Sequence, residues 1–244
     1  MKIEYDHSQN SHGVDGPNFA FTKLWDGKLP SSLLDVGCGT GTWLRAAINA
    51  GLTDVVGIDG AEIPENRLLV SKQYFRWMDL TKPIDLGRKF DSVLCLEVAE
   101  HLEKQHAEVL VDTLVSHSDN VVFSAAIPDQ LGQHHVNCQW PVWWQKLFND
   151  RGYSCNDSIR FRLWNEPNVE AWYRQNMFIA SKNPNDAYNE PRIASIIHPE
   201  MLTHLQRDSS AESRVNVIEN GGMPLAWYVK LPLKALLAKL GRRI

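Results

Sequence analysis

Short apolar segments alternate with longer segments in which apolar residues recur at helical spacing. The short segments, rich in Val, Ile, Leu and Phe, predict strands, and the longer ones predict amphipathic helices. Strands that alternate with helices in this way are typical of stacked β-α units and a parallel sheet. Strands are expected at residues 32–36, 55–59, 74–79, 90–96 and 120–125, and helices at 42–50, 106–117 and 141–152.

The pattern changes after the fifth predicted strand. A polar loop is expected at 128–139, and an Asn/Pro/Asp-rich loop at 181–190. Between them, segments 158–164 and 176–180 predict two late strands that form an antiparallel, hairpin-like edge. We therefore expect three parts: an N-terminal lid or substrate segment at 1–29, a core domain at 30–182 and a C-terminal extension at 183–244.

The composition is that of an ordinary globular protein. Hydrophobic residues make up 43% of the 244 positions and charged residues 22%, which excludes collagen-like, wholly disordered and coiled-coil classes. Apolar runs are shorter than the roughly 18 residues of a membrane span. The polar N-terminus has no signal-peptide core, and the four cysteines are widely spaced without a CxxC pair. These features predict a cytoplasmic chain without a disulfide framework or a cysteine zinc site.

A glycine-rich turn follows the first predicted strand. The sequence Gly-Cys-Gly-Thr-Gly at 37–41 places backbone N–H groups and a helix N-terminus around a ligand. Thr42 breaks the G-x-G-x-x-G spacing of nicotinamide-binding proteins. Asp35, inside the end of the strand, suits a ligand with a cationic amino group and is out of place beside a pyrophosphate. Cys38 is interpreted as a small turn residue rather than a nucleophile, because no base adjoins it.

Two further acids end the next two predicted strands. Asp59 occupies the position at which a carboxylate accepts hydrogen bonds from ribose hydroxyls. Asp79 could accept an exocyclic adenine N–H, and Leu80 beside it could pack on the ring. The alternative is that both acids are ordinary caps of strand ends. An acid at each of three strand ends favours a ligand that combines an amine, a ribose and an adenine.

These segments resemble the class I S-adenosylmethionine (SAM)-dependent methyltransferases. The matching stretches, in the order of that family, are 34–41, 57–59, 78–80 and 90–102. The resemblance implies an α/β, Rossmann-like, doubly wound sheet of seven mostly parallel strands with an antiparallel last strand. It also implies that SAM lies across the strand ends, in contact with Asp35, Gly37, Cys38, Gly39, Gly41, Asp59, Asp79, Leu80, Leu96 and Glu97.

A cluster of carboxylates and histidine follows the fourth predicted strand. Glu97, Glu100 and His101 have ExxEH spacing, which puts all three on one face of a helical turn. His134 and His135 lie in the loop after the fifth strand, at the same edge of the sheet. Two carboxylates and imidazoles can hold a divalent cation and leave positions open for substrate oxygens.

ExxEH also resembles the pattern of metal-using O-methyltransferases of ubiquinone biosynthesis and of small-RNA 3′-end 2′-O-methyltransferases. That likeness implies a cation such as magnesium on Glu97, Glu100 and His101, with His135 or His134 as a fourth ligand. Two alternatives remain open. Glu100, His101 and His135 could act as acid or base without a metal, or the cluster could be structural.

Aromatic and histidine side chains in the flanks are candidate substrate contacts. Tyr5, His7, His12 and Phe19 could line the pocket from the N-terminal segment, which could equally be a solvated tail. Trp140, Trp143 and Trp144 share one helix face, which favours core packing over a substrate wall. The substrate candidates are Tyr5, His12, His134 and Trp140.

The last residues form a basic amphipathic pattern. Residues 230–244 carry five basic and no acidic side chains, although the whole chain has a net charge of −4. From Pro232 onward, leucines recur at helical spacing. Such a helix can lie on the inner face of an anionic membrane, or it can pack on the domain or mediate homodimerisation.

The predicted function is transfer of a methyl group from SAM to an acceptor. A hydroxyl of a small molecule or saccharide is favoured, because the Glu/His cluster could activate it. RNA 2′-O-methylation is the alternative reaction, although the acidic net charge and the absence of a recognisable RNA module argue against nucleic acid. A SAM-binding regulatory or scaffold protein without turnover is the alternative outside the enzymes.

Overall fold

A computed structural model describes residues 13–25, 27–202, 218, 220, 222 and 224–230. The chain divides into two compact units, residues 1–201 and residues 202–244. In the second unit, residues 225–230 are helical, and the Tyr228 hydroxyl donates a hydrogen bond to the carbonyl oxygen of Ile218, 2.6 Å away. The first unit contains the sheet and the helices that cover it.

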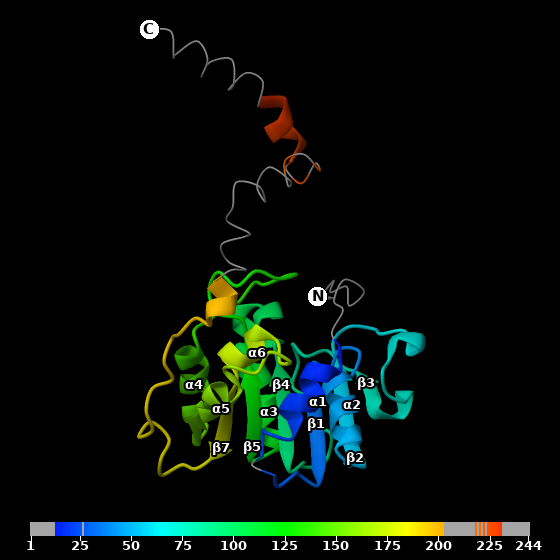
Figure 1. The fold of residues 1–244 in the computed structure, drawn as a ribbon, viewed down its shortest axis with the longest axis vertical. Coiled ribbons are helices and arrows are strands. Elements are labelled where there is room, and N and C mark those ends of the chain that lie inside the picture. Colours follow the sequence, from blue (N-terminus) through cyan, green and yellow to red (C-terminus); the bar gives the residue numbers. More distant parts are fainter. Residues whose placement is uncertain are drawn as a thin grey trace. The chain divides into compact units, whose positions relative to one another are not determined.

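One seven-stranded sheet forms the middle of this unit (Figure 1). Its spatial order is β3-β2-β1-β4-β5-β7-β6. The bounds are β1 Ser32–Val36, β2 Asp54–Asp59, β3 Phe75–Trp77, β4 Ser92–Leu96, β5 Asn120–Ser124, β6 Tyr153–Asn156 and β7 Phe178–Lys182. Strands β1 to β5 pair in parallel, whereas β7 runs antiparallel to both of its neighbours, β5 and β6. The predicted fold, including its antiparallel last strand, is confirmed.

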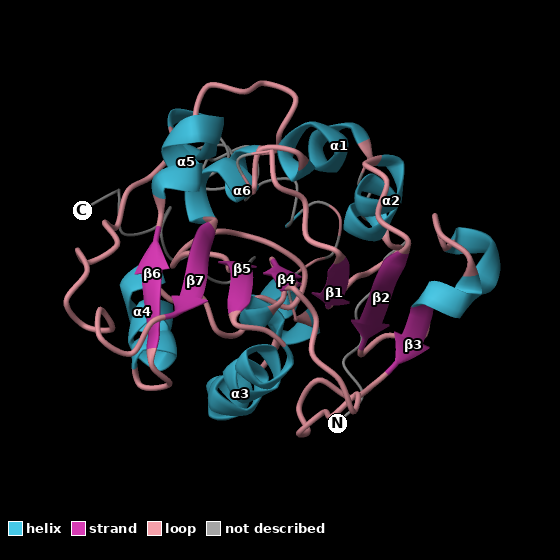
Figure 2. Cartoon of the chain, turned by 90° about the horizontal axis from the view of Figure 1, so that it is seen from below, coloured by secondary structure: helices cyan, strands magenta, loops and turns pink. Residues whose placement is uncertain are grey.

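Helices cover both faces of the sheet (Figure 2). One face carries α1 Asp15–Phe21, α2 Thr42–Asn49, α5 Ser158–Leu163 and α6 Ala171–Asn176. The opposite face carries α3 Ala107–His117 and α4 Pro141–Asn149. Every residue of β1 and β4 is buried, and apart from Ser32, Asp35 and Ser92 these residues are apolar, as expected for central strands covered on both faces.

The core consists of two apolar layers, one on each face of the sheet. Phe123 of β5 anchors the layer beneath α3 and α4, with its ring 5.1 Å from Trp144 and 5.4 Å from Phe148. On the other face, Trp43 meets Tyr173 at 5.2 Å, edge to face. Trp144 is fully buried and Trp143 packs against the same layer. The tryptophan helix is therefore mainly a core element, as favoured above.

One predicted strand is wrong. Residues 158–163 form helix α5, and the edge strand is instead β6, at 153–156. Ile159, Phe161 and Leu163 alternate with arginines, which produced the strand-like pattern. In the helix, Ile159 and Leu163 share the buried face as an i, i+4 pair, and Phe161 is 60% exposed.

The segment after β7 returns along α4, α5 and α6 and is fixed there by polar side chains. The Glu190 carboxylate accepts hydrogen bonds from Gln145 and Asn149, at 2.9 and 2.6 Å. The buried Arg160 guanidinium donates to the Ala194 carbonyl oxygen at 3.0 Å. Buried Arg174 donates to the Glu200 carboxylate. We call residues 190–201 the strap.

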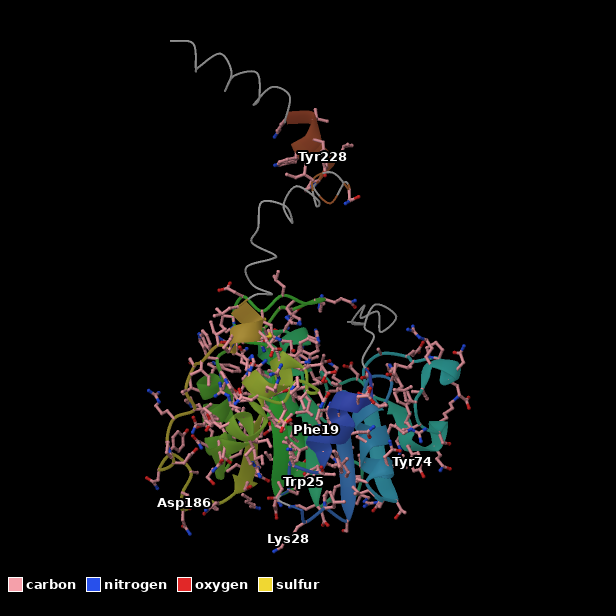
Figure 3. All side chains as sticks on the ribbon, in the orientation of Figure 1. Phe19, Trp25, Lys28, Tyr74, Asp186 and Tyr228 are labelled. Carbon is pink, nitrogen blue, oxygen red and sulfur yellow. The ribbon has the colours of Figure 1, made fainter. Side chains whose placement is uncertain are left out.

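Several sequence predictions lie outside the described residues. These are the ones that concern Tyr5, His7, His12 and the basic helix from Pro232 onward. Phe19 is described, and it lies on α1 alongside the sheet rather than at the carboxyl ends of the strands (Figure 3). Among the described residues, no helix is long and apolar enough to cross a membrane.

Substitutions in α5 test its helical state. Ile159→Ala should lower the free energy of unfolding by about 2–5 kcal/mol, because it empties a fully buried site. Phe161→Ala should change it by less than about 1 kcal/mol, since that side chain faces solvent. Urea unfolding of the two variants measures both values. Equal losses would contradict the helix, because residues 159 and 161 share a face only in a strand.

Candidate active site

A cavity of about 240 Å³ opens at the carboxyl ends of the parallel strands. Its walls come from the turn after β1, the ends of β2 and β4, the loop after β5, and helix α6. Parallel strands deliver their C-terminal residues to one edge, which is where ligands of open α/β sheets bind. One cavity thus collects residues that are far apart in the sequence.

The glycine turn forms one wall of the cavity. Gly37 has a φ of 78°, and a Cβ atom there would lie 2.3 Å from a methyl group of Val98. Only glycine readily adopts this positive φ and also leaves the space that Val98 occupies. Gly39 and Cys38 also line the cavity, whereas Gly41 precedes α2 in a left-handed conformation and does not line it. Burial raises the pKa of the Cys38 thiol well above its usual range, consistent with a turn residue that is not a nucleophile.

Asp35 of β1 lines the cavity beside the glycine turn. It is 2% exposed, and its Oδ2 atom has no hydrogen-bond partner. Burial, together with the nearby charge of Asp59, raises the pKa of Asp35 to about 8. The carboxyl group is therefore largely protonated at pH 7, and a cationic group in the cavity would favour its ionised form.

The other two strand-end acids differ in their surroundings. Asp59 lines the cavity, and its carboxylate accepts hydrogen bonds from the backbone N–H groups of Gly39 and Ala61, at 2.8 and 2.7 Å. Asp79 lies outside the lining and caps its own turn, because Oδ1 accepts from the N–H and hydroxyl of Thr81. Hydrogen bonding to Thr81 lowers the pKa of Asp79. Only its neighbour Leu80 reaches the cavity.

Three potential metal ligands meet at the opposite wall. One ligand atom each from Glu100, His101 and His135 lies within 4.8 Å of the others. Glu100 and His101 belong to the short turn Ala99–His101 after β4, and His135 comes from the loop after β5. The Glu100 carboxyl is fully buried, and neither of its oxygens has a hydrogen-bond partner. A buried carboxyl without a partner is costly, so this one calls for a proton or a cation.

The electrostatics of this cluster favour neutral imidazoles. Burial, with a further contribution from His135, lowers the pKa of His101 to about 4. Burial also lowers the pKa of His135. Burial, and next the charge of Glu97, raises the pKa of Glu100 well above its usual range. Neutral imidazoles can act as metal ligands or as bases at pH 7.

Backbone carbonyls orient both imidazoles. His135 Nδ1 lies 2.8 Å from the carbonyl oxygen of Gln130, and His101 Nδ1 lies 3.4 Å from that of His134. Since a carbonyl only accepts, we assign the proton to Nδ1 of each ring, which leaves Nε2 as the atom with the lone pair. This arrangement is usual behind metal-binding histidines.

The structure unites most of the predicted site residues in this cavity. It is lined by eleven of them: Asp35, Gly37, Cys38, Gly39, Asp59, Leu80, Leu96, Glu97, Glu100, His101 and His135. His134 contributes only its carbonyl group, and Trp140 precedes α4 without lining the cavity.

The sequence did not single out several other lining residues. The main ones are Trp172 and Tyr173 of α6, and Gln130, Leu131, Gly132 and Gln133 of the loop after β5. Gln130 carried a usable signal, since it lies in a polar loop at the edge where the other candidates meet. No short-range signal pointed to α6.

The sequence profile described as "Methyltransferase domain" matches residues 7–175, more than half of the chain. This chain belongs to the methyltransferase-domain family. The predicted class I SAM-dependent methyltransferase family and the predicted cofactor SAM are confirmed.

Individual relatives are more distant. Magnesium-protoporphyrin O-methyltransferase of a Synechocystis species is 29% identical over 120 residues, which cover 44% of this chain and 49% of that protein. The match thus spans about half the length of this relative.

Solved structures share the fold. DesVI of Streptomyces venezuelae superposes with a TM-score of 0.53 and 15% identity, covering 73% of this chain and 99% of DesVI. The methyltransferase domain of bacterial CtHen1-C superposes with a TM-score of 0.50 and 13% sequence identity, covering 70% of this chain and 100% of that domain.

Gly132 makes room for the His135 ring. A Cβ atom at position 132 would lie 2.1 Å from His135 Nε2, so Gly132→Ala should displace the imidazole. We expect the imidazole ¹⁵N shifts of His135 to lose the pattern of a single Nδ1-protonated tautomer. Gly13→Ala is the control, because nothing lies within 4 Å of its added Cβ. An unchanged His135 spectrum in Gly132→Ala would contradict this packing.

Proposed function

We propose that this methyltransferase transfers the methyl group of SAM to a hydroxyl oxygen of a small molecule or saccharide. The observation that carries this proposal is the partnerless Glu100 carboxyl beside His101 and His135, in the same cavity as the glycine turn. The sequence relative named as an O-methyltransferase supports transfer to oxygen.

The glycine-turn side of the cavity suits SAM. Asp35 would face the amino group, and Asp59 retains acceptor capacity for ribose hydroxyls beyond its two backbone hydrogen bonds. Leu80 would pack against the adenine. Asp79 does not line this side of the cavity, but its carboxylate caps the turn that carries Leu80.

The opposite wall would receive the acceptor. Trp172 and Leu131 line the same cavity as His101 and His135 and would supply apolar surface for the acceptor. The hydroxyl oxygen attacks the sulfonium methyl carbon, and a C–O bond forms as the C–S bond breaks. Sulfur keeps the electron pair, and the hydroxyl proton is released. Since SAM is already activated, the protein contributes mainly alignment and an oxygen in a reactive protonation state.

The donor set fits a divalent cation. Glu100, His101 and His135 would hold it, and the orphaned carboxylate and the two neutral imidazoles match the needs of such an ion. When bound, the cation would lower the pKa of the acceptor hydroxyl. Glu97 was also a predicted ligand, but its carboxylate already accepts hydrogen bonds from Gln130 and Asn176.

Asp35 provides a test of the cofactor orientation. Its pKa of about 8 means that it carries a proton at pH 7, and pairing with the amino group of S-adenosylhomocysteine (SAH) should release it. Titration calorimetry in buffers of different ionisation enthalpy should show release of nearly one proton. The affinity for SAH should rise with pH between 6 and 8, by up to about tenfold per pH unit. The reason is that lower pH favours the free protein with Asp35 protonated.

The matched variants are Asp35→Asn and Asp91→Asn. The first should bind SAH more weakly and release almost no proton. The second changes an exposed carboxylate near the opposite ends of the strands and should behave as the wild type. Equal proton release by Asp35→Asn and the wild type would rule out the assigned role.

The reaction itself is tested with methyl-labelled SAM. We expect label transfer to hydroxylated metabolites and saccharides, in an ether that survives alkaline hydrolysis, whereas a methyl ester would not. A chelator should abolish transfer and Mn²⁺ should restore it. Label found only in RNA, or only in alkali-labile products, would contradict the proposed acceptor, and full activity after chelation would exclude the cation.

Glu100→Gln isolates the carboxylate ligand. It keeps the side-chain volume, so we expect SAH affinity to stay unchanged while Mn²⁺ affinity falls by more than about tenfold. Titration calorimetry measures both. Glu103→Gln, at an exposed position three residues away, serves as the control. Wild-type Mn²⁺ affinity in Glu100→Gln would remove Glu100 from the site.

A further inference from the structure

Two amide side chains close on the carboxylate of Glu97. Gln130 Nε2 donates to Glu97 Oε2 at 2.9 Å, and Asn176 Nδ2 lies 3.2 and 3.4 Å from the two carboxylate oxygens. Gln130 belongs to the loop after β5, and Asn176 ends α6. The contact thus joins three segments separated by up to 79 positions in the sequence.

The two amides also fix each other. Asn176 Nδ2 lies 3.0 Å from Gln130 Oε1, and Asn176 Oδ1 accepts from Gln175 Nε2 at 2.9 Å. Both side chains are buried, with exposures of 7% for Gln130 and 1% for Asn176. Buried amides without partners would be costly, so a closed set of hydrogen bonds specifies one arrangement. We call Glu97, Gln130 and Asn176 the amide clamp.

The backbone of Glu97 needs this support. Its φ of 54° is left-handed, a conformation that costs a non-glycine residue about 1–3 kcal/mol. The Glu97 N–H donates to the carbonyl oxygen of Ser124 at 3.0 Å. From this reversal the chain enters the turn that carries Glu100 and His101. The position of both cluster residues therefore depends on how Glu97 is held.

Gln130 acts on the third member of the cluster as well. Its carbonyl oxygen accepts from His135 Nδ1, while its side chain binds Glu97. One residue thus links the two segments that supply Glu100, His101 and His135. The two glutamates also differ in their hydrogen bonds, since the Glu97 oxygens accept from amide N–H groups and those of Glu100 do not.

We propose that Gln130 and Asn176 are positioning residues for methyl transfer, which act through Glu97 to set the geometry of Glu100, His101 and His135. Glu97 is then part of the positioning unit and not a ligand of the cation. This inference rests on the proposed function, which supplies the role of the cluster. Because α6 also carries the cavity-lining residues Trp172 and Tyr173, the clamp ties this part of the cavity wall to the cluster.

An exchange of donor and acceptor tests the clamp in the full-length protein. Asn176→Asp sets a second carboxylate against Glu97 and removes the N–H donor. The double variant Glu97→Gln/Asn176→Asp restores one amide facing one carboxylate with reversed polarity. Asn189→Asp, at an exposed position with a local hydrogen bond, is the matched control. Thermal unfolding and SAH titration verify that each variant folds and retains the cofactor side of the cavity.

The decisive readouts are hydrogen exchange of the amides at 98–102 and affinity for Mn²⁺. In Asn176→Asp we expect exchange about tenfold faster and Mn²⁺ affinity about 10–100-fold lower, with SAH affinity unchanged. The double variant should recover both the wild-type exchange rate and the wild-type Mn²⁺ affinity. If Asn176 had a merely structural role, the Mn²⁺ affinity would not recover.

Two results would overturn the clamp: wild-type exchange at 98–102 in Asn176→Asp, or no recovery of exchange in the double variant. Recovery of exchange without recovery of Mn²⁺ affinity would overturn the assignment of Glu97 as a positioning group. Failure of the proposed function gives a different result. In that case the wild type binds no Mn²⁺, and the exchange data alone decide whether the clamp sets the geometry of the turn.

Discussion

Two carboxyl groups, those of Asp35 and Glu100, are buried at one edge of an apolar sheet, and that of Glu97 lies half-buried beside them. An unpaired buried charge is too costly to persist, so each group must be protonated, hydrogen-bonded or matched by a cation. The three meet this requirement differently. Asp35 holds a proton, Glu97 accepts amide N–H bonds, and Glu100 has no partner among the described residues. The chemistry of the cavity follows from that difference.

The surrounding architecture makes this burial tolerable. Strands β1 and β4 are adjacent and parallel, so the residues at their carboxyl ends enter the same cavity while the strands themselves stay in the core. Apolar layers that contain Phe123 and Trp43 pack against the two faces of the sheet. Polar groups that face a cavity from rigid elements are pre-organised, and this is what alignment of SAM and acceptor requires.

Sequence reasoning succeeded where the signal is local and failed where it is not. The glycine turn, Asp35 and the ExxEH spacing lie within single short segments, so their joint placement follows from one strand and one turn. Helix α5 was missed because the alternation of Ile159, Phe161 and Leu163 fits two periods at once, and only tertiary packing decides between them. Asn176 reaches Glu97 across 79 positions, a contact that no local pattern encodes.

The strap has a consequence for engineering of this enzyme. Helices α5 and α6 carry the buried cations Arg160 and Arg174, and the polar partners of both include atoms of residues 190–201. A graft of α5 and α6 into another scaffold, made to change the acceptor, would leave those guanidinium groups short of acceptors. The unit of exchange is therefore discontinuous, since α5 and α6 must be transferred together with the strap that lies after β7.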